Sequence, residues 1–133
     1  MPAKILIVDD DPDILDAVTM ILEAKGYQVV AARNGVEGLA CLKAEKPGIV
    51  ILDLLMPKMD GFAVLKELQA PEWSEFRDMP ILILTSVREE ASRRRYELET
   101  DQELGVDDYI EKPFSPDVLL KRVERLIKRE KKV

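Results

Sequence analysis

Short apolar runs alternate along the chain with longer segments whose apolar residues recur at helical spacing. The runs are rich in Ile, Leu and Val and are bounded by polar or turn-forming residues, which is typical of strands. The first longer segment starts at Pro12 and places apolar residues at i, i+4, i+7 and i+8, namely Ile14, Val18, Ile21 and Leu22. This spacing predicts an amphipathic helix with one buried face.

The alternation predicts five strands and five helices. We expect strands at Lys4–Val8, Tyr27–Ala32, Ile49–Asp53, Ile81–Thr85 and about Asp108–Glu111. We expect helices from Pro12 to a stop at Gly26, at Val36–Ala44, at Gly61–Gln69, at about Arg88–Leu98 and from Ser115 to about Arg129. Asn34-Gly35 is expected to turn the chain, and a polar loop to run through Trp73 and Asp78. Because such alternation implies right-handed crossovers, the predicted fold class is α/β, a single doubly wound (βα)5 domain with a five-stranded parallel sheet.

The length and composition are those of one globular domain. We expect it to span residues 1–133, with a core over about 3–127 and a basic tail or the start of a linker at 128–133. Hydrophobic residues make up 47% and charged residues 35% of the chain, which excludes wholesale disorder. No unbroken apolar run exceeds four residues, so neither a transmembrane helix nor a secretory signal is expected.

The net charge of −6 is distributed unevenly. Residues 121–133 carry seven Lys or Arg and two Glu, so residues 1–120 carry a net charge of −11. The overall charge argues against direct binding to nucleic acid or to an anionic membrane. The chain has no histidine, which excludes Ser-His-Asp catalysis, histidine-ligated zinc and phosphate carried on a histidine of this chain. The single Cys41 cannot form an internal disulfide and indicates a reducing, cytoplasmic compartment.

Polar side chains follow four of the five predicted strands. They are Asp9, Asp10 and Asp11 after the first strand, Asp53 at the end of the third, Thr85 and Ser86 at the fourth, and Lys112 after the fifth. In a doubly wound sheet the carboxyl ends of the strands form the ligand site. Clustered carboxylates repel one another unless a cation is present, and hard oxygen ligands suit Mg²⁺ or Mn²⁺. The sequence therefore predicts a divalent-metal site at this edge, with Asp11 interpreted as a capping or solvated residue.

Asp53 is the best candidate for a nucleophile, because it stands alone at the end of the most apolar strand. A carboxylate beside a metal ion can attack a phosphoryl group. Lys112 would supply a positive charge, and the Thr85 hydroxyl could donate to a phosphoryl oxygen. Plainer interpretations stay open. Asp9 and Asp10 could be an acidic helix start favoured by the helix dipole, and Thr85 could be an ordinary strand residue.

Four motifs at these strand ends have a counterpart in one known family. They are Ile5–Asp10 (ILIVDD), Ile51–Gly61 (ILDLLMPKMDG), Ile83–Ser86 (ILTS) and Asp108–Phe114 (DYIEKPF). In this order they resemble the receiver domain of two-component response regulators. The resemblance covers the chain almost from end to end, and it implies a flavodoxin-like fold and a signalling function activated by phosphorylation.

The resemblance implies a role for each acidic position. Asp53 would accept a phosphoryl group from a phosphohistidine on a partner and form an aspartyl phosphate. Asp10, Asp53 and the backbone carbonyl of Leu55 would bind Mg²⁺ or Mn²⁺ directly. Asp9 would act through a bound water.

The resemblance also implies a conformational switch. Thr85 and Lys112 would contact the phosphoryl oxygens, and Tyr109 would be a switch aromatic whose inward or outward rotamer is coupled to Thr85. Tyr109 as a half-buried strand residue without a switching role stays open. The Lys112–Pro113 bond is expected to be cis, an isomer that proline makes accessible. The output surface would comprise the fourth helix, the fifth strand and the fifth helix.

The implied partners are a sensor histidine kinase or a phosphotransfer protein, together with an effector or output domain that the sequence does not identify. The domain would be a monomer or a phosphorylation-dependent dimer, and would bind neither nucleic acid nor membrane directly. It would not be an enzyme beyond its own Mg²⁺-dependent phosphotransfer and self-dephosphorylation. Leu55 is apolar where fast-dephosphorylating receivers carry an amide or acid, so we expect slow self-dephosphorylation.

Two other functions fit the residues less well. A haloacid-dehalogenase-type phosphohydrolase also uses an aspartyl phosphate, but it needs a second Asp where this chain has Leu55. A flavodoxin-like redox carrier would need a hydroxyl-rich or Gly-rich loop after the first strand to hold the flavin phosphate. The acidic run that begins at Asp9 would instead repel that phosphate.

Two places depart from the family pattern. Ser86 stands where a smaller Ala is commoner, and the segment Arg88–Val106 is a few residues longer than usual. The extra length is either a tolerated surface insertion or a partner-specific surface.

Overall fold

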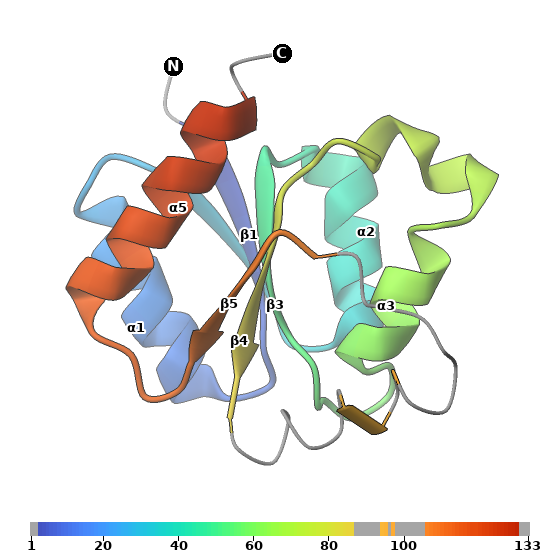
Figure 1. Cartoon of the computed structure of the whole chain (residues 1–133), viewed down its shortest axis with the longest axis horizontal. Coiled ribbons are helices and arrows are strands. Elements are labelled where there is room, and N and C mark those ends of the chain that lie inside the picture. Colours follow the sequence, from blue (N-terminus) through green and yellow to red (C-terminus); the bar gives the residue numbers. More distant parts are fainter. Residues whose placement is uncertain (1–2, 87–93, 96, 98–105, 131–133) are drawn as a thin grey trace.

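A parallel sheet forms the centre of the structure, which is a computed structural model describing residues 3–86, 94–95, 97 and 106–130 (Figure 1). Its five strands lie in the order β2-β1-β3-β4-β5. Their bounds are β1 Lys4–Val8, β2 Gln28–Ala32, β3 Ile49–Asp53, β4 Ile81–Thr85 and β5 Asp108–Glu111. Every neighbouring pair is parallel. The predicted five-stranded parallel sheet is therefore confirmed.

Helices cover both faces of the sheet. They are α1 Pro12–Glu23, α2 Gly35–Glu45, α3 Gly61–Glu67 and α5 Pro116–Glu130, with a short 3₁₀ helix η1 at Pro71–Phe76. Helices α1 and α5 lie on one face and α2 and α3 on the other (Figure 1). This is the predicted doubly wound arrangement. The helix expected at about Arg88–Leu98 falls mostly outside the described residues, of which 94, 95 and 97 are helical.

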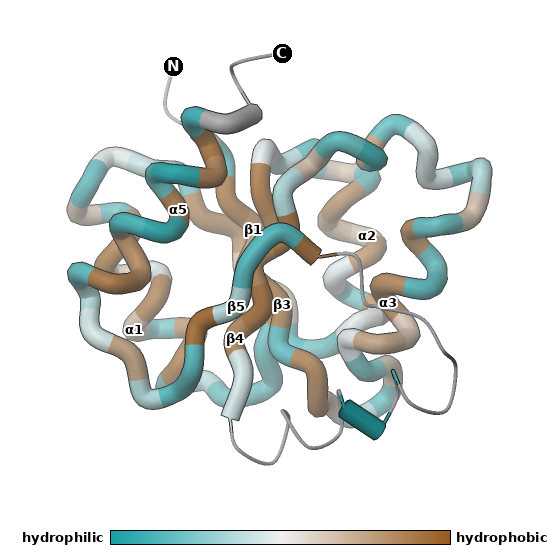
Figure 2. The backbone as a smooth tube through the Cα atoms, in the orientation of Figure 1, coloured by the Kyte–Doolittle hydropathy of each residue, from teal (hydrophilic) through white to brown (hydrophobic). Residues whose placement is uncertain are grey.

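Alternate residues of the strands build two apolar layers. Ile5, Ile7 and Ile51 face α1 and α5, whereas Leu6 and Leu52 face α2 and α3. Figure 2 shows that hydrophobic residues are concentrated along the central strands. Strand β3 is buried along its whole length, as expected for a central parallel strand covered on both sides. No helix in the described part of the chain has the length and apolar character needed to cross a membrane.

Helices α1, α2 and α3 each begin with a capping side chain at the carboxyl edge of the sheet. The Asp13 N–H donates to Asp11 Oδ1 at 2.9 Å at the start of α1. The Glu37 N–H donates to Asn34 Oδ1 at 3.0 Å at the start of α2. Asp60 Oδ1 accepts a 2.8 Å hydrogen bond from an N–H of the first turn of α3. These caps satisfy backbone donors that the helices leave open, and they confirm the interpretation of Asp11 as a capping residue.

Several local expectations differ from the structure. In α1 the buried residues are Leu15, Val18 and Leu22, whereas Ile14 and Ile21 are only partly buried. Asn34 caps α2 and Gly35 is its first residue, so the pair does not form a separate turn. Helix α5 continues to Glu130, one residue beyond the end expected at about Arg129.

The predicted polar loop around Trp73 is the 3₁₀ helix η1, and Trp73 is buried. Its Nε1–H donates to Glu67 Oε1 at 3.0 Å, and Lys43 Nζ lies 4.6 Å from its ring centroid. A cation over an aromatic face is attracted by the ring quadrupole. The segment is too short for apolar periodicity to reveal it, and its burial depends on contacts from α2 and α3.

We expect Asp60→Ala to lower the free energy of unfolding by about 1 kcal/mol, because a short helix loses its capping acceptor. Asp60→Asn keeps an acceptor at the same position and should lose much less. Urea unfolding followed by circular dichroism measures both. Equal destabilisation by the two substitutions would show that the cap is not what Asp60 contributes.

Candidate functional site

Three carboxylates converge where β1 and β3 end. One carboxylate oxygen from each of Asp9, Asp10 and Asp53 lies within 4.8 Å of the others. Asp9 and Asp53 are buried, with 0% and 1% of their surface exposed, and Asp10 is exposed. The strands position them because β1 and β3 are neighbours, with Val8 paired to Leu52. The acidic cluster predicted from the strand ends is therefore present, with one side open to solvent.

The Lys112 ammonium lies among these acids. Its Nζ is 3.1 Å from Asp9 Oδ2 and 3.5 Å from Asp53 Oδ1. Lys112 follows β5, which is separated from β3 by β4, so its long side chain spans the end of an intervening strand. It is 18% exposed, and its charge offsets part of the repulsion between the two buried carboxylates.

Backbone N–H groups orient the same carboxylates. The Asp11 N–H donates to Asp9 Oδ1 at 2.9 Å, and the Leu55 N–H donates to Asp53 Oδ1 at 3.4 Å. The Asp9 N–H donates to the Ala32 carbonyl at 3.1 Å, which extends the pairing of β1 with β2 by one residue. Each buried acid thus has its direction set by the loop that follows it.

Burial raises the pKa of Asp9 from 3.8 to about 6. The hydrogen bond from the Asp11 N–H is the largest opposing effect. The charge of Asp53 raises the pKa further, and the charge and hydrogen bond of Lys112 lower it. Desolvation disfavours the charged form of a carboxyl group, and a nearby cation favours it. A metal ion in this cluster would therefore be bound more tightly as the acids ionise.

Thr85 and Lys112 are joined at the ends of β4 and β5. The Lys112 N–H donates to the Thr85 carbonyl at 2.6 Å, and Thr85 Oγ1 donates to the Ser86 carbonyl at 3.2 Å. Thr85 is buried, and the Lys112–Pro113 bond is cis, the isomer that the resemblance implies. Tyr109 is half-buried against the α2 and α3 side of the core. The structure thus brings Thr85 and Lys112 together and places Tyr109 on β5, beside Ile83 of β4.

The loop between β3 and α3 closes tightly around the end of β3. The Gly61 N–H donates to the Leu54 carbonyl at 2.9 Å, and a Cβ on Gly61 would collide with the Asp53 carbonyl oxygen. Lys58 adopts a left-handed φ of 67° within the loop. Within this loop, only Leu55 was expected to take part in the site. The Asp60-Gly61 pair before a helix was the available signal for a close backbone approach.

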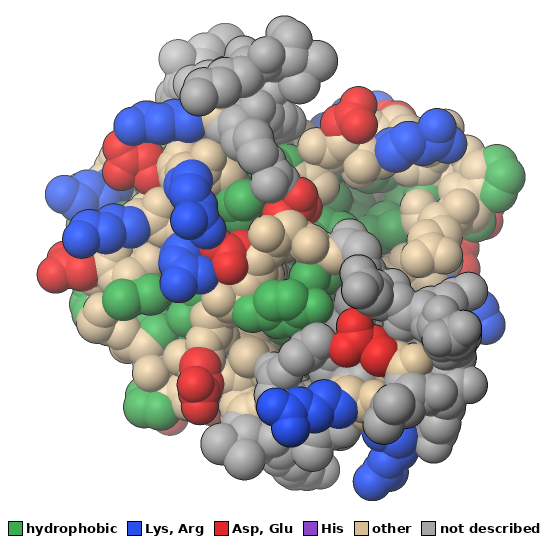
Figure 3. Space-filling model, in the orientation of Figure 1, with side chains coloured by type: hydrophobic (Ala, Val, Ile, Leu, Met, Phe, Trp, Pro, Cys, Tyr) green, Lys and Arg blue, Asp and Glu red, His purple; other side chains and the backbone are tan. Residues whose placement is uncertain are grey.

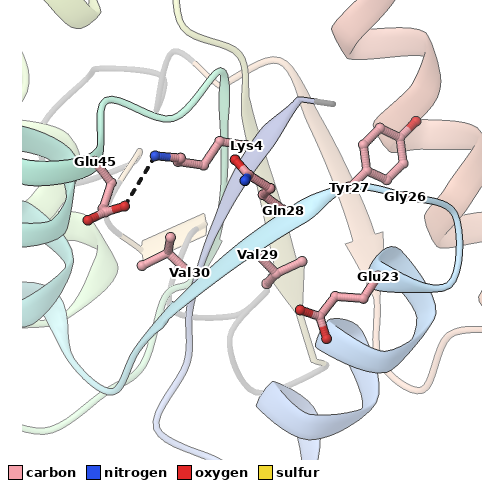
Figure 4. A pocket seen from close by; sticks show the side chains of 8 residues that line it. All are labelled: Lys4, Glu23, Gly26, Tyr27, Gln28, Val29, Val30 and Glu45. Carbon is pink, nitrogen blue, oxygen red and sulfur yellow. Dashed lines mark hydrogen bonds and ion pairs between the residues drawn. The ribbon is translucent and has the colours of Figure 1, made fainter. Parts of the chain in front are cut away.

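A cavity of about 500 Å³ lies at the opposite end of the sheet (Figure 4). Lys4 and Gln28, the first residues of β1 and β2, line it, and the ion pair between Lys4 Nζ and Glu45 Oε1 spans 3.2 Å there. Asp9 and Asp53 are at the carboxyl ends of their strands. The cavity is therefore separate from the acidic cluster.

A family model described as the response regulator receiver domain matches residues 5–124. The chain belongs to this family. It is 40% identical over 126 residues to a probable transcriptional regulator ycf27 of Porphyridium aerugineum, covering 95% of this chain and 48% of that protein. It is 39% identical over 129 residues to the alkaline phosphatase synthesis transcriptional regulatory protein PhoP of Bacillus subtilis, covering 97% and 50%. The receiver domain described here thus spans about half the length of these relatives.

Solved structures show the same fold. A putative response regulator from Chloroflexus aurantiacus superposes with a TM-score of 0.80 at 32% identity, covering 96% of this chain and 99% of that one. The chemotaxis response regulator CheY4 of Vibrio cholerae also gives 0.80 at 32% identity, covering 95% and 99%. The flavodoxin-like α/β fold predicted from the sequence is therefore confirmed.

Without divalent metal, we expect Asp9→Asn to stabilise the protein at neutral pH and to have its smallest effect near pH 4. Between pH 3.8 and about 6 the folded protein holds a proton on Asp9 that the unfolded chain releases. Stability contributed by this group is therefore lost as the pH rises through about 6. At about 1.36 kcal/mol per pKa unit, the full effect is up to about 3 kcal/mol.

Urea unfolding in EDTA at several pH values measures this difference. Asn keeps an acceptor for the Asp11 N–H, but its amide replaces the oxygen that pairs with Lys112. The change of the difference with pH, and not its absolute size, therefore reports the titration of Asp9. A difference in unfolding free energy that does not change between pH 4 and pH 7 would contradict the raised pKa.

Proposed function

We propose that this receiver domain takes a phosphoryl group onto Asp53 in a divalent-metal-dependent reaction and passes the signal on through its β5 and α5 face. The observation that carries the proposal is the convergence of Asp9, Asp10 and Asp53 within 4.8 Å, with Lys112 Nζ 3.5 Å from Asp53 Oδ1. Such a cluster combines a nucleophile, ligands for a cation and a fixed positive charge.

The donor set fits Mg²⁺ or Mn²⁺. All the side-chain donors are carboxylate oxygens, which these hard cations prefer, and nitrogen or sulfur ligands that would favour zinc are absent from the described cluster. Asp10 is exposed and leaves the site accessible, while burial makes Asp9 hard to ionise without a cation. Asp10, Asp53 and the Leu55 carbonyl would hold the ion directly, and Asp9 through a water. When bound, the ion would neutralise charge on the transferring phosphoryl oxygens.

An Asp53 carboxylate oxygen would attack the phosphorus of a phosphohistidine on a sensor kinase or phosphotransfer protein. The new bond is P–O, the bond that breaks is P–N, and the leaving imidazole nitrogen keeps the electron pair. Lys112 would balance the negative charge of the acyl phosphate, and the Thr85 hydroxyl would turn toward a phosphoryl oxygen. The phosphohistidine would lie outside this domain, since its 133 residues include no histidine.

The signal would leave through β5 and α5. Asp108 Oδ1 accepts a 2.7 Å hydrogen bond from Arg122 Nη1, and Asp108 also pairs with Arg125. The same Arg122 nitrogen donates to the Tyr109 carbonyl at 3.1 Å, which links the proposed switch residue to α5. Figure 3 shows Lys and Arg side chains gathered over this helix. A rotation of Tyr109 coupled to Thr85 would therefore change the charged surface of α5.

The partner on the output side would be an effector or a second domain. Relatives named as transcriptional regulators are about twice as long as this chain. Their extra length supports a covalently attached output domain. The receiver itself would act as a monomer or as a phosphorylation-dependent dimer in the cytoplasm.

We expect incubation with acetyl phosphate and Mg²⁺ to add one phosphoryl group, seen by intact mass spectrometry. Asp53→Asn should abolish the adduct because Asn is a poor nucleophile of nearly the same shape, and EDTA should abolish it because the acids lose their cation. Asp16→Asn, an exposed acid on α1, is the control and should keep it. A folded protein without an adduct, or an adduct that survives in Asp53→Asn, would overturn the proposal.

We expect slow loss of the phosphoryl group and a faster loss in Leu55→Asn. The Leu55 side chain is apolar, half-buried and two residues after Asp53, so it cannot orient an attacking water as an amide could. Leu55→Met keeps an apolar side chain and should leave the rate unchanged. The decay of the phosphorylated mass after removal of acetyl phosphate measures all three, and a half-life of seconds for the unsubstituted protein would contradict the expectation.

A further inference from the structure

The loops that follow β2 and β3 touch at Gly35. Helix α2 begins at Gly35, and its N–H donates to the Met59 carbonyl at 2.9 Å. Met59 lies in the loop between Asp53 and the Asp60 cap of α3. A backbone hydrogen bond thus ties the start of α2 to the loop that follows Asp53.

The contact at Gly35 is too close for any side chain. A Cβ on Gly35 would lie 2.5 Å from the Met59 carbonyl oxygen, 2.7 Å from Val64 Cγ2 and 2.8 Å from Met59 Cγ. Real Cβ atoms essentially never approach another heavy atom closer than 3.0 Å. The nearest atom belongs to the backbone, so relief would require the loop and the start of α2 to move apart.

The same loop carries the carbonyl assigned to the metal. It is held at its start by the hydrogen bond of the Leu55 N–H to Asp53 Oδ1 and at its end by that of the Gly61 N–H to the Leu54 carbonyl. The hydrogen bond from the Gly35 N–H to the Met59 carbonyl ties the loop to the start of α2. An outward shift at Met59 would be transmitted through a short, tightly closed segment to Leu55, because packed backbone has little room to absorb it.

We propose that Gly35 is a positioning residue for the metal site. It holds the 54–60 loop where the Leu55 carbonyl and the Asp53 carboxylate can bind the same cation. This inference rests on the proposed function. Coupling between two sites is reciprocal, so whatever the Gly35 contact adds to metal affinity, bound metal adds to the stability of that contact.

Hydrogen exchange in the unsubstituted chain tests this reciprocity. The Gly35 N–H bonds to the loop, whereas the Gly38 N–H bonds to the Asn34 carbonyl at 2.9 Å within the first turn of α2. Adding Mg²⁺ should slow exchange at Gly35 about tenfold and at Gly38 less than about twofold, as a coupling of ordinary size between two sites predicts. Equal slowing at the two amides, or none at Gly35, would overturn the proposal.

A pair of variants tests the same coupling through the affinity for Mg²⁺. Gly35→Ala forces the loop and the start of α2 apart, and Leu42→Ala removes a buried side chain two turns along the same helix. Mg²⁺ affinity is measured by calorimetry at a temperature where both proteins are fully folded. Gly35→Ala should weaken Mg²⁺ binding by about tenfold and Leu42→Ala by less than about twofold. Equal weakening in the two would mean that α2 acts only through general stability.

Different outcomes would overturn the proposed function and the role of Gly35. If the unsubstituted protein binds no Mg²⁺, the proposed function and the role of Gly35 fall together. If it binds Mg²⁺ and takes up a phosphoryl group, but Gly35→Ala binds Mg²⁺ as well as the parent, only the role of Gly35 is overturned. Should Gly35→Ala not fold, the exchange measurement on the unsubstituted chain still decides the question.

Discussion

The ion pairs of Lys112 with Asp9 and Asp53 are the interactions on which the carboxyl edge of the sheet depends. They bring together residues from the ends of β1, β3 and β5, at Nζ–O distances of 3.1 and 3.5 Å. Two buried carboxylates so close together repel one another, and each loses hydration on folding. One ammonium offsets only part of this cost, as the raised pKa of Asp9 shows. The edge therefore keeps an excess of negative charge that a divalent cation would neutralise.

The sheet makes such an arrangement tolerable. Strand β3 is buried from Ile49 to Asp53, so an acid at its end is desolvated simply by following the strand. The surrounding apolar layers stabilise the fold enough to carry a locally unfavourable cluster, because hydrophobic burial is the dominant favourable contribution to folding. Local strain and unfavourable charge of this kind are typical of functional sites.

Much of the fold and of the acidic cluster could be predicted from the sequence. The strands were evident from their apolar runs, and the rule that parallel strands end at one edge was enough to bring Asp9, Asp53 and Lys112 together. The choice of Leu15 over Ile14 in α1 could not be predicted, because it depends on how the helix rotates against its neighbours. The contact between Gly35 and Met59 also escaped, since it joins two loops far apart in the chain. The pKa of Asp9 was likewise out of reach, because it depends on burial that only the packed structure defines.

Lys112 also connects the acidic cluster to the rest of β4 and β5. Its ammonium contacts Asp9 and Asp53, while its backbone N–H donates to the Thr85 carbonyl at 2.6 Å. A phosphoryl group on Asp53 would draw the ammonium toward new oxygens. The backbone of the same residue is fixed to β4, so this pull would act directly on Thr85. A charge change at Asp53 therefore needs no long pathway to reach β5, because one residue takes part in both sets of contacts.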